Sequence, residues 1–238
     1  MKNIKLIAMD LDGTLTQHKT PLDEEHTNAL IALSKKYKLL MVGAGMCNRI
    51  FKQMNEFPID ILGNYGMQYA EYNKDTKSLD IVFDEKRPCD KESIEKRVTA
   101  MRKKHGFTSF AGENVEYHSS GCVTFPILGT EAKTEDKLAF DPDRKKRRAI
   151  YDEIKEVFSD YTVFVGGSSS FDMAPYPFDK AYALGKYCDE RGIAHDEVLY
   201  IGDDYGPGGN DESVYLSDFN YLTIDDYRDF PKLVENLM

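Results

Sequence analysis

The stretch "AMDLDGTLT", residues 8–16, places two acidic residues at the end of an apolar run. The run is "IKLIAM", residues 4–9, which is typical of a buried strand, and Asp10, Asp12 and Gly13 follow it directly. In a parallel α/β sheet, ligands bind outside the carboxyl ends of the strands. The stretch therefore predicts a strand that ends in a functional site.

Strand-like and helix-like segments alternate near both ends of the chain. In the first third, apolar residues at helical spacing over 21–37 are followed by the apolar run "KLLMVGAG", residues 38–45, and by a second helical pattern over 48–57. In the last third, a helical pattern that ends at Gly192 precedes the apolar run "EVLYIGDD", residues 197–204. This alternation is typical of an α/β fold with a parallel sheet.

The middle of the chain has a different character. Basic residues are dense there, and sheet-like runs such as "NVEYHSSGCVTFPI" and "YTVFVGG" lie between turns. We therefore expect a Rossmann-like core built from residues 1–85 and 177–238, with an α+β domain inserted at residues 86–176. The most basic run, "DRKKRR" at residues 143–148, is interpreted as a solvated helix face, with an anion-binding site as the alternative.

Composition limits the classes of partner and compartment. The 238 residues carry 31 basic and 41 acidic side chains, a net charge of −10, which argues against a nucleic-acid or anionic-membrane surface. The four cysteines lie far apart, without a C-x-x-C pair, so reduced thiols are expected rather than a zinc site or a disulfide framework. With no signal peptide and no membrane span indicated, we expect a cytoplasmic protein.

Acidic and amide side chains gather after the two strands that are predicted to end in the site. They are Asp10, Asp12, Asp203, Asp204, Asn210 and Asp211, the last two after the glycine-rich turn "GPGG". Carboxylates that converge repel one another unless a cation holds them, and Mg²⁺ is the hard cation that oxygen ligands suit. A calcium loop is excluded, because the glycine of "DLDGT" comes at the fourth position and a strand precedes it.

Several motifs together resemble one superfamily. "DLDGTLT" at residues 10–16, Lys180 in "FDK" and "GDDYGPGGND" at residues 202–211 resemble three motifs of the haloacid dehalogenase (HAD) superfamily of phosphotransferases. With "GGSSSFDMAPYPFDKAYAL" at residues 166–184, the chain looks like the eukaryotic-type phosphomannomutase branch. That branch carries an inserted α+β cap of type IIB.

The resemblance implies roles for individual residues. Asp10 would be the nucleophile that forms an aspartyl-phosphate, and Asp12 the general acid and base. Lys180 would pair with Asp10 and the phosphate, while Asp10, the backbone carbonyl of Asp12, and Asp203 would hold Mg²⁺. Asn210 and Asp211 are further candidate ligands of the metal.

The resemblance also implies contacts to the substrate. Ser170 and Asp172 stand at positions that contact sugar hydroxyls, and Gly66 at a core-to-cap glycine turn. Asp204 is left open between support of the metal site and a solvated acid.

The chain departs from the superfamily at the second motif, which normally supplies a Ser or Thr hydroxyl to the phosphate. Residues 38–49 contain neither. We expect the backbone N–H groups of Gly43, Ala44 and Gly45 to hold the phosphate oxygens instead.

A second departure concerns the cap arginines that hold the far phosphate of a mutase substrate. Residues 114–138 contain no arginine. Lys19 and His118 stand where the branch has arginines, and Lys133 or Lys137 are candidates to replace others.

These observations favour a Mg²⁺-dependent phosphatase of a small phosphorylated metabolite, with a sugar phosphate as the expected class. The first alternative is a phosphomannomutase-like phosphohexomutase. The second is a weakly active or inactive protein that binds a phosphorylated ligand in a regulatory role. No nucleic-acid or membrane partner is expected, and a homodimer is left open.

Overall fold

A computed structural model describes residues 3–238, and they form two compact units. The core unit contains the N-terminal segment up to Asp84, together with Asp179–Gly206 and Asp211–Met238. The insert unit contains Glu85–Phe178 and also the short segment Pro207–Asn210. The sequence did not indicate that residues 207–210 pack with the insert.

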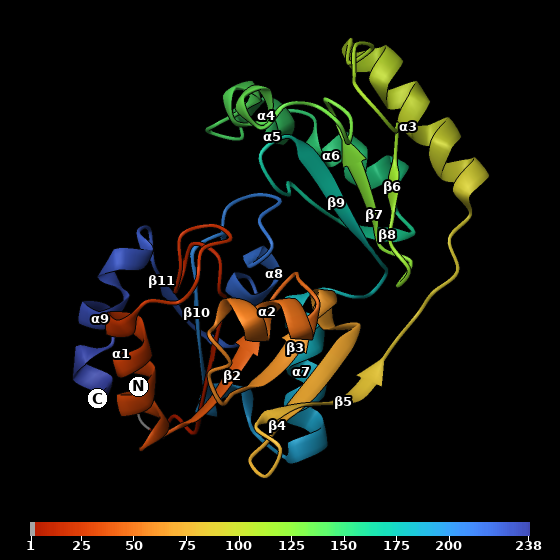
Figure 1. Ribbon diagram of the computed structural model, residues 1–238. Coiled ribbons are helices and arrows are strands. Elements are labelled where there is room, and N and C mark those ends of the chain that lie inside the picture. Colours follow the sequence, from red (N-terminus) through yellow and green to blue (C-terminus); the bar gives the residue numbers. More distant parts are fainter. Residues whose placement is uncertain (1–2) are drawn as a thin grey trace. The chain divides into compact units, whose positions relative to one another are not determined.

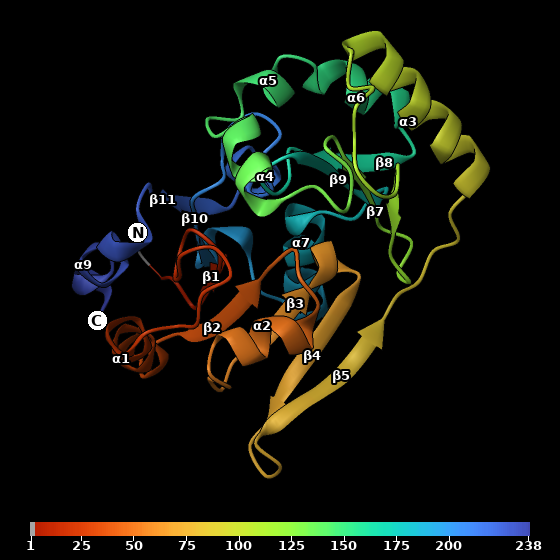
Figure 2. The ribbon, with the colours of Figure 1, turned by 45° about the horizontal axis from the view of Figure 1, so that its top comes forward.

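The core unit is built on a seven-stranded sheet with the order β11-β10-β1-β2-β3-β4-β5. Its first five strands in that order run parallel, and β4 and β5 form an antiparallel hairpin at one edge (Figures 1 and 2). The strands are β1 (Leu6–Met9), β2 (Lys38–Val42), β3 (Asp60–Gly63), β4 (Gln68–Asn73), β5 (Ser78–Asp84), β10 (Val198–Gly202) and β11 (Asn220–Thr223). The expected Rossmann-like parallel sheet is confirmed, and the hairpin is an addition to it.

Helices cover both faces of this sheet because its strands are apolar on both sides. Ile7 and Met9 of β1 pack with α1, α2 and α9, while Leu6 and Ala8 pack with α7 and α8. The helices are α1 (Glu24–Ser34), α2 (Cys47–Gln53), α7 (Lys180–Arg191), α8 (Glu212–Tyr215) and α9 (Phe230–Leu233), with short 3₁₀ turns η1 (Asn64–Gly66), η2 (His195–Glu197), η3 (Tyr227–Asp229) and η4 (Glu235–Leu237). Within residues 3–238, no helix combines the length and the apolar character needed to cross a bilayer.

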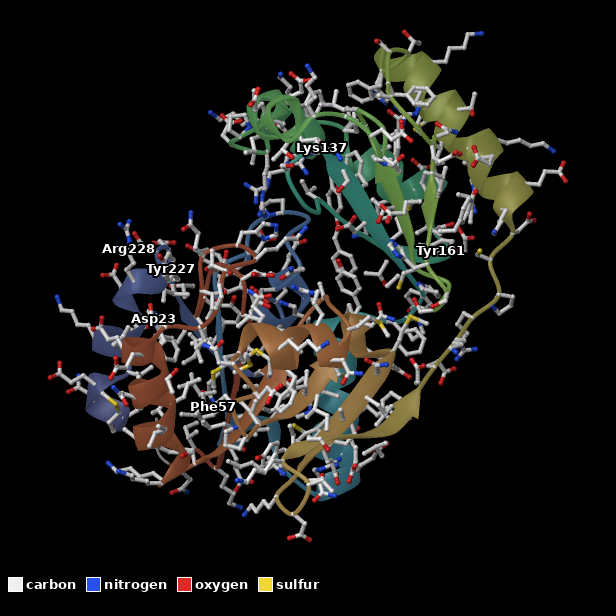
Figure 3. All side chains as sticks on the ribbon, viewed as in Figure 1. Asp23, Phe57, Lys137, Tyr161, Tyr227 and Arg228 are labelled. Carbon is white, nitrogen blue, oxygen red and sulfur yellow. The ribbon has the colours of Figure 1, made fainter. Side chains whose placement is uncertain are left out.

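Local signals explain where two of these helices begin and end. The Asp23 carboxylate accepts from His26 N (2.9 Å) at the start of α1, and the buried His26 ring bridges Asp23 Oδ1 (2.7 Å) and Tyr227 O (2.8 Å). Figure 3 labels Asp23 and Tyr227 at this point. Helix α7 ends at Gly192 with φ +62°, as the sequence predicts, because glycine adopts the left-handed conformation without strain.

The insert unit is an antiparallel sheet with helices, which confirms the predicted α+β insert. The strand order is β6-β7-β9-β8, and α3 and α6 pack on one face of the sheet around Val98, Phe125, Ile154 and Phe171. The elements are α3 (Lys91–His105), β6 (Glu116–Tyr117), β7 (Val123–Pro126), α4 (Thr134–Phe140), α5 (Lys145–Arg148), α6 (Tyr151–Val157), β8 (Tyr161–Phe164) and β9 (Ser170–Pro175).

Strand alternation sorts the side chains of β9 between the two faces of this sheet. Phe171 and Met173 join the apolar core with α3 and α6, so Ser170 and Asp172 point to the opposite face. Thr124 of β7 pairs with Asp172 in register and lies on that same face. The face away from α3 and α6 therefore carries a row of polar side chains.

The basic run 143–148 is only in part the solvated helix face that its composition suggests. Lys145 and Lys146 are exposed, but Arg147 is 1% exposed and pairs with the buried Asp141 through Nε and Oδ2 (2.9 Å). The prediction is wrong for Arg147, because a buried partner compensates the charge that composition assigned to solvent.

Candidate active site

The candidate site begins where two neighbouring parallel strands end. Asp10 follows β1 and Asp203 follows β10, and Asp10 N donates to Ile201 O (3.0 Å), which extends the pairing of the two strands by one residue. The chain passes from β1 to β2 in one direction across the sheet and from β10 to β11 in the other, so the strand order reverses between β1 and β10 and this is the switch point of the sheet. Ligand crevices of open α/β sheets lie at such points.

Lys180, the first residue of α7, is fully buried between two carboxylates. Its Nζ lies 2.8 Å from Asp10 Oδ1 and 2.7 Å from Asp211 Oδ1. The helix positions it because Asp179 caps α7 by accepting from Tyr182 N (2.7 Å). A buried ammonium is stable here because its charge is shared by two anions.

Asp211 is itself held from three sides. Besides Lys180, its Oδ1 accepts from the hydroxyl of Tyr200 (2.5 Å), and its Oδ2 accepts from Asp204 N (3.1 Å). Asp211 is 0% exposed. Asp204 thus meets the cluster through its backbone N–H, and Asp211 fixes the position of the Lys180 ammonium.

Three carboxylates form a cluster that fits a divalent cation. Ligand oxygens of Asp10, Asp203 and Asp211 all lie within 4.8 Å of one another. A Cβ at Gly13 would lie 2.5 Å from Asp203 Cγ, so only glycine leaves room for this carboxylate, and Thr14 Oγ1 donates to Asp203 Oδ1 (3.1 Å). An all-oxygen donor set with this charge suits Mg²⁺.

Burial and neighbouring charges shift the pKa values of the cluster. Burial raises the pKa of Asp203 to about 6, with the nearby Asp211 carboxylate adding to the effect. Burial also raises the pKa of Asp10 well above its usual value, although Lys180 opposes this. Burial alone would lower the pKa of Lys180, but Asp10 and Asp211 outweigh it and the pKa is raised. Two carboxylates thus hold protons more tightly than in water, which is the condition that a bound cation relieves.

Asp12 faces away from this cluster. Its Oδ1 accepts from Gln53 Nε2 (2.7 Å) and from Lys19 N (2.7 Å), and its carboxylate is not part of the metal-binding group found among residues 3–238. The Lys19 side chain is exposed, so the structure brings Lys19 to Asp12 through its backbone. Asp12 was expected to hold the metal through its carboxylate or its backbone carbonyl. Only the backbone carbonyl remains a candidate ligand.

The glycine turn after β2 is packed against the next strand. Gly43 N donates to Leu62 O (2.9 Å), and Gly45 O accepts from Asn64 N (2.7 Å). We expected the backbone N–H groups of Gly43, Ala44 and Gly45 to bind phosphate, but the Gly43 N–H already donates to β3. Backbone donation to a phosphate is left to Ala44 and Gly45.

Gly66, expected at a core-to-cap turn, lies inside the core unit. It adopts φ +88°, and a Cβ there would lie 2.4 Å from its neighbour in α7, so the position requires glycine. The contact brings η1 against α7 at Ala183.

In the insert unit, the structure brings three predicted substrate contacts together: Ser170 and Asp172, which were expected to contact sugar hydroxyls, and His118, which was expected in place of a phosphate-binding arginine. Thr124 Oγ1 donates to Asp172 Oδ1 (3.1 Å) and lies 3.1 Å from His118 Nε2. Ser170 Oγ lies 3.3 Å from Asp172 Oδ1 and 3.1 Å from Gly166 O. Burial raises the pKa of Asp172, although these hydroxyl donors oppose it. The result is a connected polar row of hydroxyl, carboxylate and imidazole.

Arg147, which the sequence did not single out, holds the loop that precedes this row. Its Nη1 donates to the carbonyl oxygens of Gly166 (2.5 Å), Gly167 (3.3 Å) and Ser170 (3.0 Å), while Asp141 pairs with its Nε. No local pattern marks these contacts, because they join α5 to a turn about 20 residues away.

The remaining candidates also lie in the insert unit. Lys133 is exposed, and Lys137 of α4, labelled in Figure 3, donates from Nζ to Thr130 O (3.0 Å). Asn210 belongs to the segment that packs with the insert, whereas Asp211 belongs to the core unit.

Comparison with known families and proteins is consistent with this geometry. A family described as "Eukaryotic phosphomannomutase" matches residues 27–226. A probable phosphomannomutase of Caenorhabditis elegans is 25% identical over 98% of this chain and 95% of its own length. The phosphomannomutase of Schizosaccharomyces pombe is 25% identical over 89% of this chain and 85% of its own length.

Solved structures share the fold of the chain. An IMP-bound IMP-nucleotidase of Plasmodium falciparum superposes with a TM-score of 0.70 at 16% identity, covering 100% of this chain and 68% of that one. A phosphatase of the HAD superfamily from Bacteroides thetaiotaomicron gives a TM-score of 0.61 at 14% identity, covering 98% and 95%. The family match spans most of the chain and agrees with the motifs and the sheet order. The chain therefore belongs to the eukaryotic phosphomannomutase family.

Proposed function

We propose that the chain is a Mg²⁺-dependent phosphotransferase of the phosphohexomutase type, acting on a phosphorylated hexose through an aspartyl-phosphate at Asp10. The observation that carries the proposal is the buried Lys180, which bridges Asp10 and Asp211 at the carboxyl end of β1. A buried lysine between two carboxylates at the switch point of a sheet favours a phosphoryl-transfer site over an ion pair with a purely structural role.

The residues divide the chemistry between two carboxylates. The Asp10 carboxylate attacks phosphorus, a P–O bond to Asp10 forms, and the P–O bond to the leaving oxygen breaks. Asp12 donates a proton to that leaving oxygen and later removes one from the acceptor hydroxyl that attacks the aspartyl-phosphate. Gln53, which donates to Asp12 Oδ1, would keep the other oxygen of Asp12 directed toward the substrate.

Asp10, Asp203 and the backbone carbonyl of Asp12 would hold Mg²⁺, with Asp211 beside them. When bound, the ion supplies positive charge to the oxygens of the transferring phosphoryl group. Lys180 supplies a second, fixed positive charge on the side of Asp10. Together they allow an acidic protein to bind an anionic substrate.

The relatives favour the mutase over the phosphatase that the sequence placed first. The curated proteins quoted above are named as phosphomannomutases, and the chain aligns with most of their length. Ser170 and Asp172 lie on one face of the insert sheet, which supports contacts to sugar hydroxyls. In a mutase the acceptor that Asp12 activates is a sugar hydroxyl, whereas in a phosphatase it is water.

A sugar-phosphate phosphatase is the second candidate, and a specific observation favours it. A mutase must also bind the phosphate at the far end of its bisphosphate intermediate, which arginine forks do best. Residues 114–138 hold no arginine, and Lys137 donates to Thr130 O. Weak retention of the bisphosphate would let water compete as the acceptor.

The deciding experiment follows both outcomes in one reaction. Hexose 1- and 6-phosphates are incubated with Mg²⁺ and a hexose bisphosphate activator, and isomerisation and phosphate release are measured together. Isomerisation faster than release supports the mutase, and release without isomerisation supports the phosphatase. Asp10→Asn should lower either activity by about 10³-fold or more, because it removes the nucleophile but not the fold. If neither activity is detected, the enzyme proposal fails and the regulatory alternative remains.

A further inference from the structure

The missing hydroxyl of the second motif leaves a specific space, and a side chain fills it. A Cβ built on Gly45 would lie 2.6 Å from Arg49 Cζ, with Nη2 and Nε closer still. The guanidinium of Arg49 therefore lies directly over Gly45, where a serine or threonine side chain at this position would project. Gly45 does not adopt a positive φ, so its backbone would accept such a residue.

Neighbouring side chains orient the Arg49 guanidinium but use only part of its N–H donors. Arg49 Nη1 donates to Gln53 Oε1 (2.7 Å), and Gln53 Nε2 donates to Asp12 Oδ1 (2.7 Å). Arg49 Nη2 lies 3.7 Å from Asp12 Oδ2, beyond hydrogen-bond distance, and the side chain is 45% exposed. Within residues 3–238, Nη2 and Nε of Arg49 make no hydrogen bond.

We infer that Arg49 binds the transferring phosphoryl group in place of the hydroxyl that the second motif lacks. The ligand is a phosphate monoester or inorganic phosphate, whose oxygens match the planar fork of a guanidinium. The inference rests on the proposed function, because it assigns the phosphate site of that same centre. It would also place a positive charge beside Asp12, whereas Lys180 lies beside Asp10 and Asp211.

A simple surface ion pair with Asp12 explains the arrangement less well. At 3.7 Å and with a half-exposed arginine, such a pair contributes little. It also gives no reason for the guanidinium to lie over Gly45. Asp12 is the proposed proton donor to the leaving oxygen, which is bonded to the phosphoryl group. Gln53 holds Arg49 beside Asp12, so Arg49 would also lie beside the phosphoryl group.

The test measures binding of inorganic phosphate, a probe that needs no turnover. Isothermal titration of inorganic phosphate into protein with Mg²⁺ compares the wild type, Arg49→Ala and Lys52→Ala, an exposed lysine on the same helix that has no role in the site. We expect Arg49→Ala to weaken phosphate binding by roughly 10- to 100-fold, as the loss of a charge-assisted contact does, and Lys52→Ala to change it by less than about 2-fold.

A second variant asks whether Arg49 replaces the hydroxyl. In the Arg49→Ala background, Gly45→Ser places a hydroxyl in the vacated space, and we expect it to recover at least about 3-fold in affinity. A serine at this position restores a contact to phosphate without restoring a charge beside Asp12. Recovery therefore separates phosphate binding from an effect on Asp12.

The outcomes distinguish this inference from the proposed function. Equal phosphate affinity in the wild type and Arg49→Ala overturns the inference, as does a wild type that binds no phosphate. A variant with unchanged phosphate affinity but a shifted pH profile of kcat would make Arg49 a positioning residue for Asp12, which also overturns it. If the wild type transfers no phosphoryl group but Arg49→Ala still weakens binding, the proposed function fails and the inference stands.

Discussion

At the scale of single residues, the site is governed by a balance of buried charge. Asp10, Asp203 and Asp211 lie close together, and Lys180 is the buried cation among them. Removing one partner from such a group leaves uncompensated charge in the interior, which costs more than the pair contributes. Burial raises the pKa of Asp203, the Asp211 carboxylate adds to the effect, and the opposing charge of Lys180 does not cancel it.

This balance predicts a pH-dependent stabilisation by Mg²⁺. With a pKa of about 6, the folded chain binds the Asp203 proton more tightly than the unfolded chain, so without metal this group's contribution to stability falls as pH rises toward 6. Above pH 6 the carboxylate is charged and free to bind Mg²⁺, whereas below it protons compete. We expect Mg²⁺ at about 100 times Kd to add about 2.7 kcal/mol at pH 7.5 and far less at pH 5.

Calorimetric melting with and without Mg²⁺ at the two pH values measures this effect. Asp203→Asn is the control, because the amide keeps the shape but loses the charge, and its response to Mg²⁺ should be small at both pH values. Equal Mg²⁺ stabilisation of the wild type at pH 5 and pH 7.5 would contradict the assignment of Asp203.

At the scale of elements, a four-residue helix holds the polar row of the insert sheet in place. Helix α5 delivers Arg147 to the turn at residues 166–170, and Asp141 neutralises its charge. Without this anchor, the carbonyl oxygens of the turn would lose a donor that has five N–H groups. Ser170 and Asp172 would then lose the rigid support on which a binding site depends.

Arg147→Met should therefore destabilise the insert unit by about 3–5 kcal/mol, because it leaves the Asp141 carboxylate buried and unpaired. Hydrogen exchange at residues 166–170 should accelerate, and urea unfolding gives the free energy. Lys145→Met on the same helix is the matched control and should change neither, since Lys145 is exposed. Unchanged exchange at residues 166–170 in Arg147→Met would refute the anchoring role.

Sequence patterns predicted the elements whose residues carry local signals. The strand before Asp10 is a continuous apolar run, and α7 ends at Gly192 as expected. The hairpin β4–β5 was not predicted, because β5 is largely exposed and shows no apolar alternation, with Ile81 and Val82 both facing solvent. Exposed edge strands lack the pattern that burial imposes.

The site was predictable to the extent that motifs place residues at strand ends. Asp10, Asp203 and Lys180 carry such motifs, and the structure brings them together. The position of the Arg49 guanidinium over Gly45 could not be predicted from the sequence, because it depends on how side chains pack around this turn. Residues 207–210 join the insert through contacts such as Val165 N to Gly208 O (2.8 Å), which no local pattern encodes.

At the scale of the whole molecule, the two units have separate apolar cores. The core unit packs around both faces of its own sheet, and the insert unit packs around α3, α6 and its antiparallel sheet. Each unit is large enough to contain its own hydrophobic core, so each can unfold as a cooperative unit. Variants in one core should then act mainly on one transition.

We expect two transitions in urea, each sensitive to a different buried pair. Lys180→Met should shift only the transition of the core unit, because it leaves Asp10 and Asp211 unpaired there, and Arg147→Met only that of the insert unit. Hydrogen exchange with mass analysis assigns each transition to its residues. A single transition that both variants shift equally would show that the two units unfold together.

The sheet order of the core unit fixes the sequence of events during synthesis of the chain. Strand β1 lies between β2 and β10, with Leu6 opposite Val198, so β1 gains its second neighbour only after the insert unit's segment from α3 to β9 and helix α7 have been made. The segment from α3 to β9, by contrast, is complete once residue 175 has emerged. Pairing β1 with β10 closes a long loop, and the entropic cost of closing it arises when β10 joins the sheet. Asp10, the proposed nucleophile, is thus synthesised long before Asp203, which joins it only when β10 has paired with β1.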